Sequence, residues 1–123
     1  MVSIVLYRDA DGTCPVLDFL DRAPREVRVK AQARIELLAM HGHHLRRPHA
    51  DYIGDGLYEL RWRHRRVNYR LLYFLHGRRV IVMVQALTKE DRLPAAAIAQ
   101  ALKCRHRFEC APDAHTYAPE VAP

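Results

Sequence analysis

The stretch ELRWRHRRVNYRLLYFL, residues 59–75, decides the fold of this 123-residue chain. It reads as a β-hairpin, because runs of alternating or apolar residues at 57–63 and 67–75 flank a short basic turn around Arg65. The first run alternates, with Tyr58, Leu60 and Trp62 on one face and Glu59, Arg61 and Arg63 on the other. The second run is apolar on both faces near its end, which is typical of a central strand.

The hairpin is rich in positive charge. Its arginines are Arg61, Arg63, Arg65, Arg66 and Arg70. The window from Leu60 to Lys89 contains eight Arg or Lys residues and no Asp or Glu, so it carries a charge of +8, whereas the whole chain carries +6. A basic block on an otherwise near-neutral chain points to a polyanionic partner.

Strand pairing is expected to bring two of these arginines together. A turn near Arg65 places Arg61 opposite Tyr69 or Arg70, depending on the register. Like charges directly opposite each other destabilise a sheet by roughly some tenths of a kcal/mol, and we find no nearby acid in the sequence to offset them. We therefore expect an open basic surface that binds a nucleic-acid backbone, with Arg70 at the surface. The alternative is a solvated basic edge that aids solubility.

The rest of the chain predicts one α+β domain over residues 1–110. The expected elements are a strand at 2–7, helices at 13–23 and 24–42, a loop at 43–56, strands at 57–63, 67–75 and 80–87, a helix at 94–109 and a loose tail over 111–123. The order β-α-α-β-β-β-α indicates a compact domain with a mainly antiparallel sheet and helices packed on one side.

Other features narrow the class of protein. No segment reaches the roughly 18 consecutive apolar residues of a membrane helix. The start, MVSIVLYRDADG, does not read as an export signal, which predicts a cytoplasmic location and no membrane partner. Three cysteines, Cys14, Cys104 and Cys110, favour reduced and partly buried thiols over a disulfide framework.

Histidine and cysteine gather in two segments, HGHHLRRPH at 41–49 and CRHRFECAPDAH at 104–115. Neither segment has the paired Cys-x-x-Cys spacing of a structural zinc site. We therefore expect no metal site, and no other cofactor.

Four motifs, in this order and spacing, carry a resemblance to a known family. They are DFLDRAPREVRVKA at 18–31, GLYELR at 56–61, YRLLYF at 69–74 and a Lys-x-x-Arg-x-Pro segment at 89–94. From about Tyr7 to Phe108, the chain resembles the RelE/HigB superfamily of toxins, and within it the phage-derived HigB-like branch. The resemblance implies a compact RelE-like domain of order β-α-α-β-β-β-α.

The resemblance also implies a function. Such proteins are toxins of type II toxin–antitoxin systems, which enter the ribosomal A site and cut the mRNA there. A cognate antitoxin, often a small helix-turn-helix protein, neutralises the toxin and represses the operon, so operator DNA is reached only through the antitoxin. The basic residues of the family fall here on Arg61, Arg70 and Lys89.

Metal-independent RNA cleavage needs groups that move protons and cations that stabilise the phosphate. The candidates for proton transfer are His64, Tyr69 and Lys89, and Arg61 and Arg70 fit charge stabilisation. The candidates for binding the RNA backbone are Arg63, Arg65, Arg66 and Arg92. The aromatic side chains Trp62, Tyr69 and Tyr73 could stack on bases, although the alternation also places Trp62 in the core.

The chain departs from the branch pattern in the segment 84–90. Val84 stands in place of a histidine, Ala86 of an aromatic residue, Thr88 of a lysine and Glu90 of a threonine. These changes favour an alternative, a non-catalytic relic that keeps the fold and binds RNA or an antitoxin. A DNA-binding regulator acting alone is less well supported, because no helix carries a basic recognition face.

The long helix at 24–42 is the expected docking surface for the antitoxin. Its outer face is expected to offer Arg28, Lys30, Gln32 and Arg34.

Overall fold

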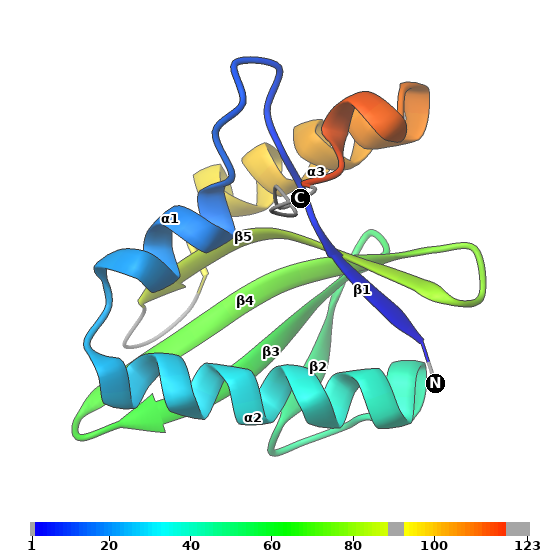
Figure 1. Cartoon of the computed structure of the whole chain (residues 1–123). Helices are drawn as coiled ribbons and strands as arrows, with labels where there is room; N and C mark the ends of the chain where they lie inside the picture. The colour runs from blue at the N-terminus through cyan, green and yellow to red at the C-terminus, as the bar shows by residue number, and fades with distance from the viewer. Residues whose placement is uncertain (1, 89–92, 118–123) are drawn as a thin grey trace, which may run out of the picture.

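The computed structural model describes residues 2–88 and 93–117 of the chain. These residues form five strands and three helices, which run in the order β1, α1, α2, β2, β3, β4, β5, α3 (Figure 1). The bounds are β1 Ser3–Leu6, α1 Pro15–Arg22, α2 Arg25–His41, β2 Ala50–Gly54, β3 Leu57–His64, β4 Val67–His76, β5 Val80–Thr88 and α3 Ala95–Cys110. The α+β class is confirmed, and so is the predicted order of elements apart from the added strand β2.

The strands form one sheet in the order β1-β5-β4-β3-β2. β1 runs parallel to β5 and the other neighbouring strands are antiparallel, so the sheet is mainly antiparallel as predicted. In the β3–β4 register Arg61 is the direct partner of Arg70, and Trp62 is the partner of Tyr69. This register decides between the alternatives that the sequence left open.

β2 lies in the segment 43–56, for which the sequence predicted a loop, and that prediction is wrong for Ala50–Gly54. The strand reads ADYIG, and Asp and Gly are both depleted in strands. It forms because it pairs with β3, with Ala50 opposite Leu60 and Tyr52 opposite Tyr58. Long-range pairing decides this element, so local sequence preference could not reveal it.

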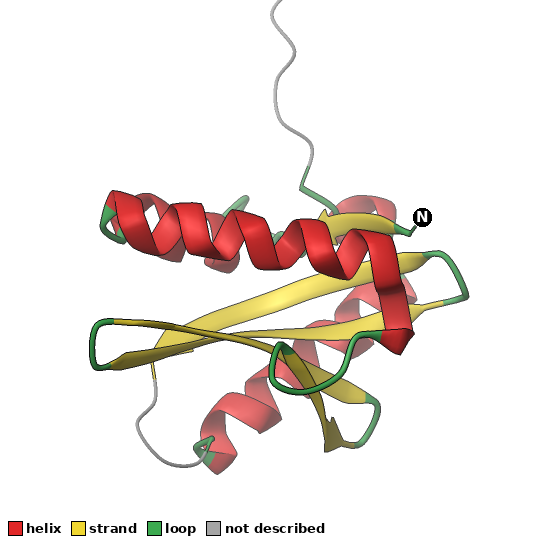
Figure 2. Ribbon diagram, turned by 90° about the horizontal axis from the view of Figure 1, so that it is seen from below, coloured by secondary structure: helices red, strands yellow, loops and turns green. Residues whose placement is uncertain are grey.

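Helices cover both faces of the sheet, which corrects the prediction that they pack on one side (Figure 1, Figure 2). On one face α1 and α2 pack on a core that includes Val16, Val27, Ala31, Leu38, Leu60, Trp62, Leu71 and Tyr73. On the opposite face α3 packs on a core that includes Leu57, Leu72, Phe74, Val82, Ala101, Cys104 and Phe108. The reason lies in the central strands: Leu71 to Phe74 are all buried, so both faces of the sheet need cover.

The predicted tail is attached to the domain as far as the structure describes it. Residues Asp113–His115 form a 3₁₀ turn, and Thr116 pairs with Tyr7 at the edge of the sheet. The ring of His115 stacks on that of Tyr7, with centroids 5.2 Å apart. Residues 113–116 are therefore held against the domain, and residues 118–123 of the predicted tail lie outside the described part.

Cys14 and Cys104 are buried, Cys110 is exposed, and all three are free thiols. In the described part of the chain, no helix is both long enough and apolar enough to span a membrane.

Candidate functional site

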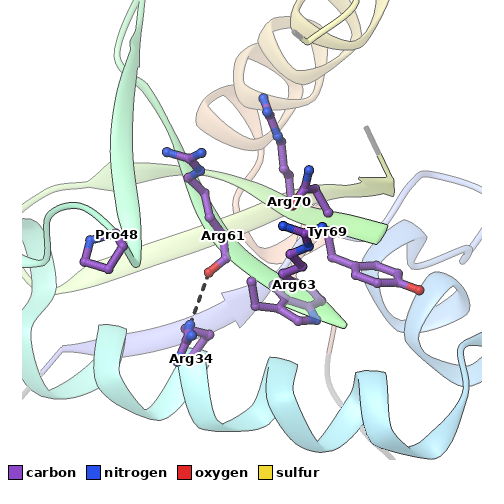
Figure 3. Close-up of a pocket in the computed structure, with 8 residues that line it drawn as sticks. Arg34, Pro48, Arg61, Arg63, Tyr69 and Arg70 are labelled. Atoms are coloured by element: carbon purple, nitrogen blue, oxygen red, sulfur yellow. Dashed lines mark hydrogen bonds between the residues drawn. The ribbon is translucent and has the colours of Figure 1, made fainter. Parts of the chain in front are cut away.

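The basic residues of β3 and β4 gather around a pocket, here called the arginine pocket (Figure 3). It has a volume of about 240 Å³ and is lined by Arg34, Pro48, Arg61, Trp62, Arg63, Asn68, Tyr69 and Arg70. Figure 3 shows that the side chains of Arg61 and Arg70 point to the same side of the sheet, away from α2. Several arginines around one concave surface create a positive potential that attracts anions.

A second pocket adjoins the arginine pocket, because Arg61 and Arg70 line both. This α3-side pocket has a volume of about 460 Å³ and is lined by Arg47, Ile53, Glu59, Arg61, Arg70, Leu93 and Ile98. The two arginines therefore stand between two hollows. Arg61 and Arg70 are thus the residues that the two pockets share.

A buried carboxylate, that of Glu59, bridges the two arginines. Its Oε1 lies 3.5 Å from Nε of Arg61, and its Oε2 lies 3.1 Å from a terminal guanidinium nitrogen of Arg70. Only 5% of the Glu59 side chain is exposed. The expectation that no acid offsets the arginines is wrong, because Glu59 stands one residue before the acid-free window.

The sequence did carry a signal for this contact. Glu59 and Arg61 are two residues apart on one strand, so they share a face. The direct partner of Glu59 is Leu72, which makes Arg70 its diagonal neighbour across the strands. Once the register is known, the three charged residues fall on one face.

The two arginines differ in exposure. The side chain of Arg61 is 37% exposed and that of Arg70 only 12%. The expectation that Arg70 lies at the surface is therefore wrong, since it packs beside a buried carboxylate. Arg61 is the more open cation of the two.

Helix α2 supports β3 from the other face of the sheet. β2 pairs with β3 only as far as Leu60, and two side chains of α2 bind the edge of β3 after that residue. Nε of Arg34 donates to the carbonyl of Arg61 at 3.1 Å, and Nζ of Lys30 donates to the carbonyl of Arg63 at 3.2 Å. The amide of Arg61 donates to the carbonyl of His49 at 2.7 Å. Lys30 and Arg34 therefore do not form the free outer face that the sequence suggested.

Most of the aromatic side chains are unavailable to a ligand. Trp62 is buried and stacks on Tyr69, with centroids 5.5 Å apart and planes at 12°. Tyr73 is buried and stacks on Tyr58, and burial raises the pKa of the Tyr73 hydroxyl. Of the three predicted stacking residues, only the half-buried Tyr69 lines the arginine pocket with part of its surface open.

The other predicted residues are spread around the hairpin. Arg63 lines the arginine pocket, whereas the exposed Arg65 and Arg66 form the turn and line neither pocket. His64 is half-buried at the end of β3 and also lines neither pocket. The predictions for Lys89 and Arg92 fall on residues outside the described part of the chain.

The histidine and cysteine segments do not assemble a metal-binding group in the described ranges: no three His, Cys, Asp or Glu side chains come together there. His43 and His44 contact each other on the 3₁₀ turn after α2, and His106 lies one helical turn from Cys110 on α3.

Residues 18–106 match a family model whose description is Phage derived protein Gp49-like (DUF891). The chain belongs to this Gp49-like family. The family is related to the toxins of toxin–antitoxin systems. A search of curated proteins finds no match to the chain.

The matched range contains every residue that lines the arginine pocket and the α3-side pocket. It extends from within α1 into the last turns of α3. The candidate site therefore lies entirely within the part of the chain that matches the Gp49-like family. The chemistry that the site offers is a pair of guanidinium groups that share one carboxylate, with Tyr69 lining the arginine pocket from the opposite face of the hairpin.

Proposed function

We propose that this Gp49-like chain is the toxin of a type II toxin–antitoxin system, and that it cuts mRNA on the ribosome as RelE/HigB toxins do. The observation that carries the proposal is the Arg61–Arg70 pair between two open pockets, in a family related to such toxins. Guanidinium groups suit phosphate because their planar fork donates parallel hydrogen bonds. The proposed ligand is the phosphodiester backbone of single-stranded RNA.

The proposed reaction is an internal transfer within RNA. The 2′-oxygen attacks the neighbouring phosphorus, the bond from phosphorus to the 5′-oxygen breaks, and the products are a 2′,3′-cyclic phosphate and a 5′-hydroxyl. The proton lost by the 2′-hydroxyl is balanced by one gained at the leaving 5′-oxygen. Arg61 and Arg70 would stabilise the charge on the crowded phosphate, where fixed donors have their largest effect.

Proton transfer is the less complete part of the proposed site. Tyr69 lines the arginine pocket and is our first candidate for contact with the reacting atoms. His64 lines neither pocket, so it would need a movement of the hairpin to take part. Lys89 remains a candidate by resemblance alone. A ribosome that positions the mRNA would supply much of the rate by orientation, which would make a weak acid–base set sufficient.

We further propose that a cognate antitoxin, a small helix-turn-helix protein, silences the toxin in the cytoplasm. The toxin would associate with operator DNA only through its complex with the antitoxin. The exposed apolar residues Val29 and Met40 on α2 offer it a contact surface, since 58% and 64% of their surfaces are exposed.

A second candidate function is a non-catalytic relic that binds RNA or the antitoxin without cleavage. It is favoured by the composition of the arginine pocket, whose lining contains arginines and Tyr69 but no histidine or carboxylate. The carboxylate of Glu59 lines the α3-side pocket and is already engaged by two arginines.

Induced expression in growing bacteria tests the proposal. We expect the wild-type chain to arrest growth and to produce new 5′ ends within translated mRNAs, and Arg61→Ala to do neither. Arg79→Ala is the matched control, because Arg79 is an exposed arginine in the β4–β5 turn outside both pockets. Growth arrest without mRNA cleavage would reject the nuclease, and binding of RNA without either effect would favour the relic.

A further inference from the structure

We propose that Glu59 is a positioning residue that gives the two arginines different tasks. It fixes Arg70 in place, and it leaves Arg61 as the group that contacts the RNA phosphate. This inference rests on the proposed function, because it concerns how the same pocket receives a phosphodiester.

The contacts of Glu59 are unequal. Its Oε2 accepts a hydrogen bond from Arg70 at 3.1 Å, whereas its Oε1 lies 3.5 Å from Nε of Arg61 as an ion pair. A charge-assisted hydrogen bond to a buried carboxylate restricts a guanidinium more than a longer ion pair does. Arg70, with a side chain only 12% exposed, is therefore the immobile member.

Arg61 combines a fixed backbone with an open side chain. Its carbonyl accepts from Arg34 and its amide donates to His49, so two hydrogen bonds at the outer edge of β3 hold its backbone in place. Its side chain is about three times as exposed as that of Arg70, 37% against 12%. Glu59 needs only to set the direction of the guanidinium. This is the arrangement expected of a group that is aligned before the ligand arrives.

Glu59 also has an electrostatic cost for binding. A carboxylate close to the site repels an incoming phosphate, and this repulsion weakens binding of RNA in the ground state. Alignment of the cations, in contrast, favours the transition state. Replacement of Glu59 by a neutral residue is therefore expected to tighten RNA binding and to slow cleavage. A residue that only maintains the fold would lower both.

Two measurements on the purified chain separate these roles. Binding is measured with a 2′-O-methyl RNA, which cannot be cut, and cleavage is measured as a single-turnover rate on mRNA held by ribosomes. For Glu59→Gln we expect binding tighter by roughly three- to tenfold at low salt. We expect the cleavage rate to fall by about tenfold or more.

Glu109→Gln is the matched control. It makes the same change of acid to amide, and Glu109 also pairs with an arginine, Arg105, at 3.4 Å on α3. Neither residue lines the two pockets, so the variant should cut RNA at the wild-type rate. Glu59→Asp covers the case in which Glu59→Gln does not fold: it keeps the charge and shortens the reach, so it should bind as the wild type does and cut more slowly.

The inference is overturned if folded Glu59→Gln binds RNA more weakly than the wild type or cuts at the same rate, while the wild type still cuts and the proposed function stands. If the wild-type chain binds RNA but does not cut it, the affinity of Glu59→Gln for RNA is the test. Tighter binding than the wild type then supports the inference, and weaker binding overturns it. A wild-type chain that does not bind RNA overturns both the inference and the proposed function.

Discussion

At the scale of single residues, the site depends on the carboxylate of Glu59, which lies one residue before the acid-free window of the sequence. Two arginines face each other directly across β3 and β4, which alone would destabilise the sheet. Glu59 offsets them from within the core, with 5% of its side chain exposed. A buried ion pair of this kind is seldom retained for stability, since apolar residues of similar size often do as well. Its presence is better explained by a requirement for cations at fixed positions.

Arg70→Ala is expected to destabilise the fold, because it removes the closer ion-pair partner of a buried carboxylate. We expect the free energy of unfolding to fall by about 2–4 kcal/mol, somewhat below the value for a fully buried pair. Urea denaturation measures this loss. Arg61→Ala should cost about 0–1 kcal/mol, because Arg61 is more exposed.

The double variant Glu59→Leu/Arg70→Met is the control for this prediction. It removes both charges together and should recover most of the stability lost in Arg70→Ala. An Arg70→Ala chain as stable as the wild type would show that Glu59 does not depend on Arg70.

At the scale of elements, the β3–β4 hairpin places the arginines, and its turn is under strain. Arg65 has a φ of 57°, in the left-handed region that favours glycine. The two-residue turn, closed by the pair His64 and Val67, requires such a conformation.

Arg65→Gly is expected to stabilise the chain. Glycine relieves roughly 1–2 kcal/mol of left-handed strain. It also loses about 0.5–1 kcal/mol through its greater freedom in the unfolded chain, so a net gain of about 0–1.5 kcal/mol remains. Thermal unfolding checks the change. Arg66→Gly is the matched control, since Arg66 lacks a positive φ and the same substitution should reduce stability; a loss of stability in Arg65→Gly would contradict the argument.

At the scale of the whole molecule, the sequence predicted the parts that depend on local pattern. Alternation located β3, and the helices predicted at 13–23 and 24–42 correspond to α1 and α2. The sequence did not reveal β2, because this strand forms only by pairing with β3. It also placed α3 on the wrong face of the sheet. The apolar pattern of β4 and β5 indicates that both faces are covered, but it does not say which helix covers which face.

The same limit applies to the site. The positive charges were visible in the sequence, but the register that joins Arg61, Arg70 and Glu59 is a property of the folded sheet. Burial of Trp62 and Tyr73 likewise follows from the cover that helices give to one face. The roles proposed for Lys89 and Arg92 stay predictions.

A complex with the antitoxin is expected to use the exposed face of α2. Lys30 and Arg34 are held against β3, so the apolar contacts offered there are Val29 and Met40. A stable complex should bury on the order of 1,000 Å² or more. Val29→Asp should weaken it by about tenfold or more, as loss of a central contact does.

Co-purification of the chain with the product of the neighbouring gene measures this loss. Ala99→Asp, at an exposed position of α3, is the control and should leave the complex intact. Equal binding by Val29→Asp and the wild type would place the antitoxin elsewhere on the molecule.

The most direct test of the central claim, that Arg61 contacts RNA phosphate in the arginine pocket, is the salt dependence of binding to a 2′-O-methyl RNA. Each phosphate contact to a single strand contributes about 0.7 to the slope of log affinity against log salt concentration. We predict that Arg61→Ala lowers the slope by about one such contact and weakens binding at low salt, while Arg79→Ala leaves both unchanged. An Arg61→Ala chain with the affinity and salt slope of the wild type would contradict the account.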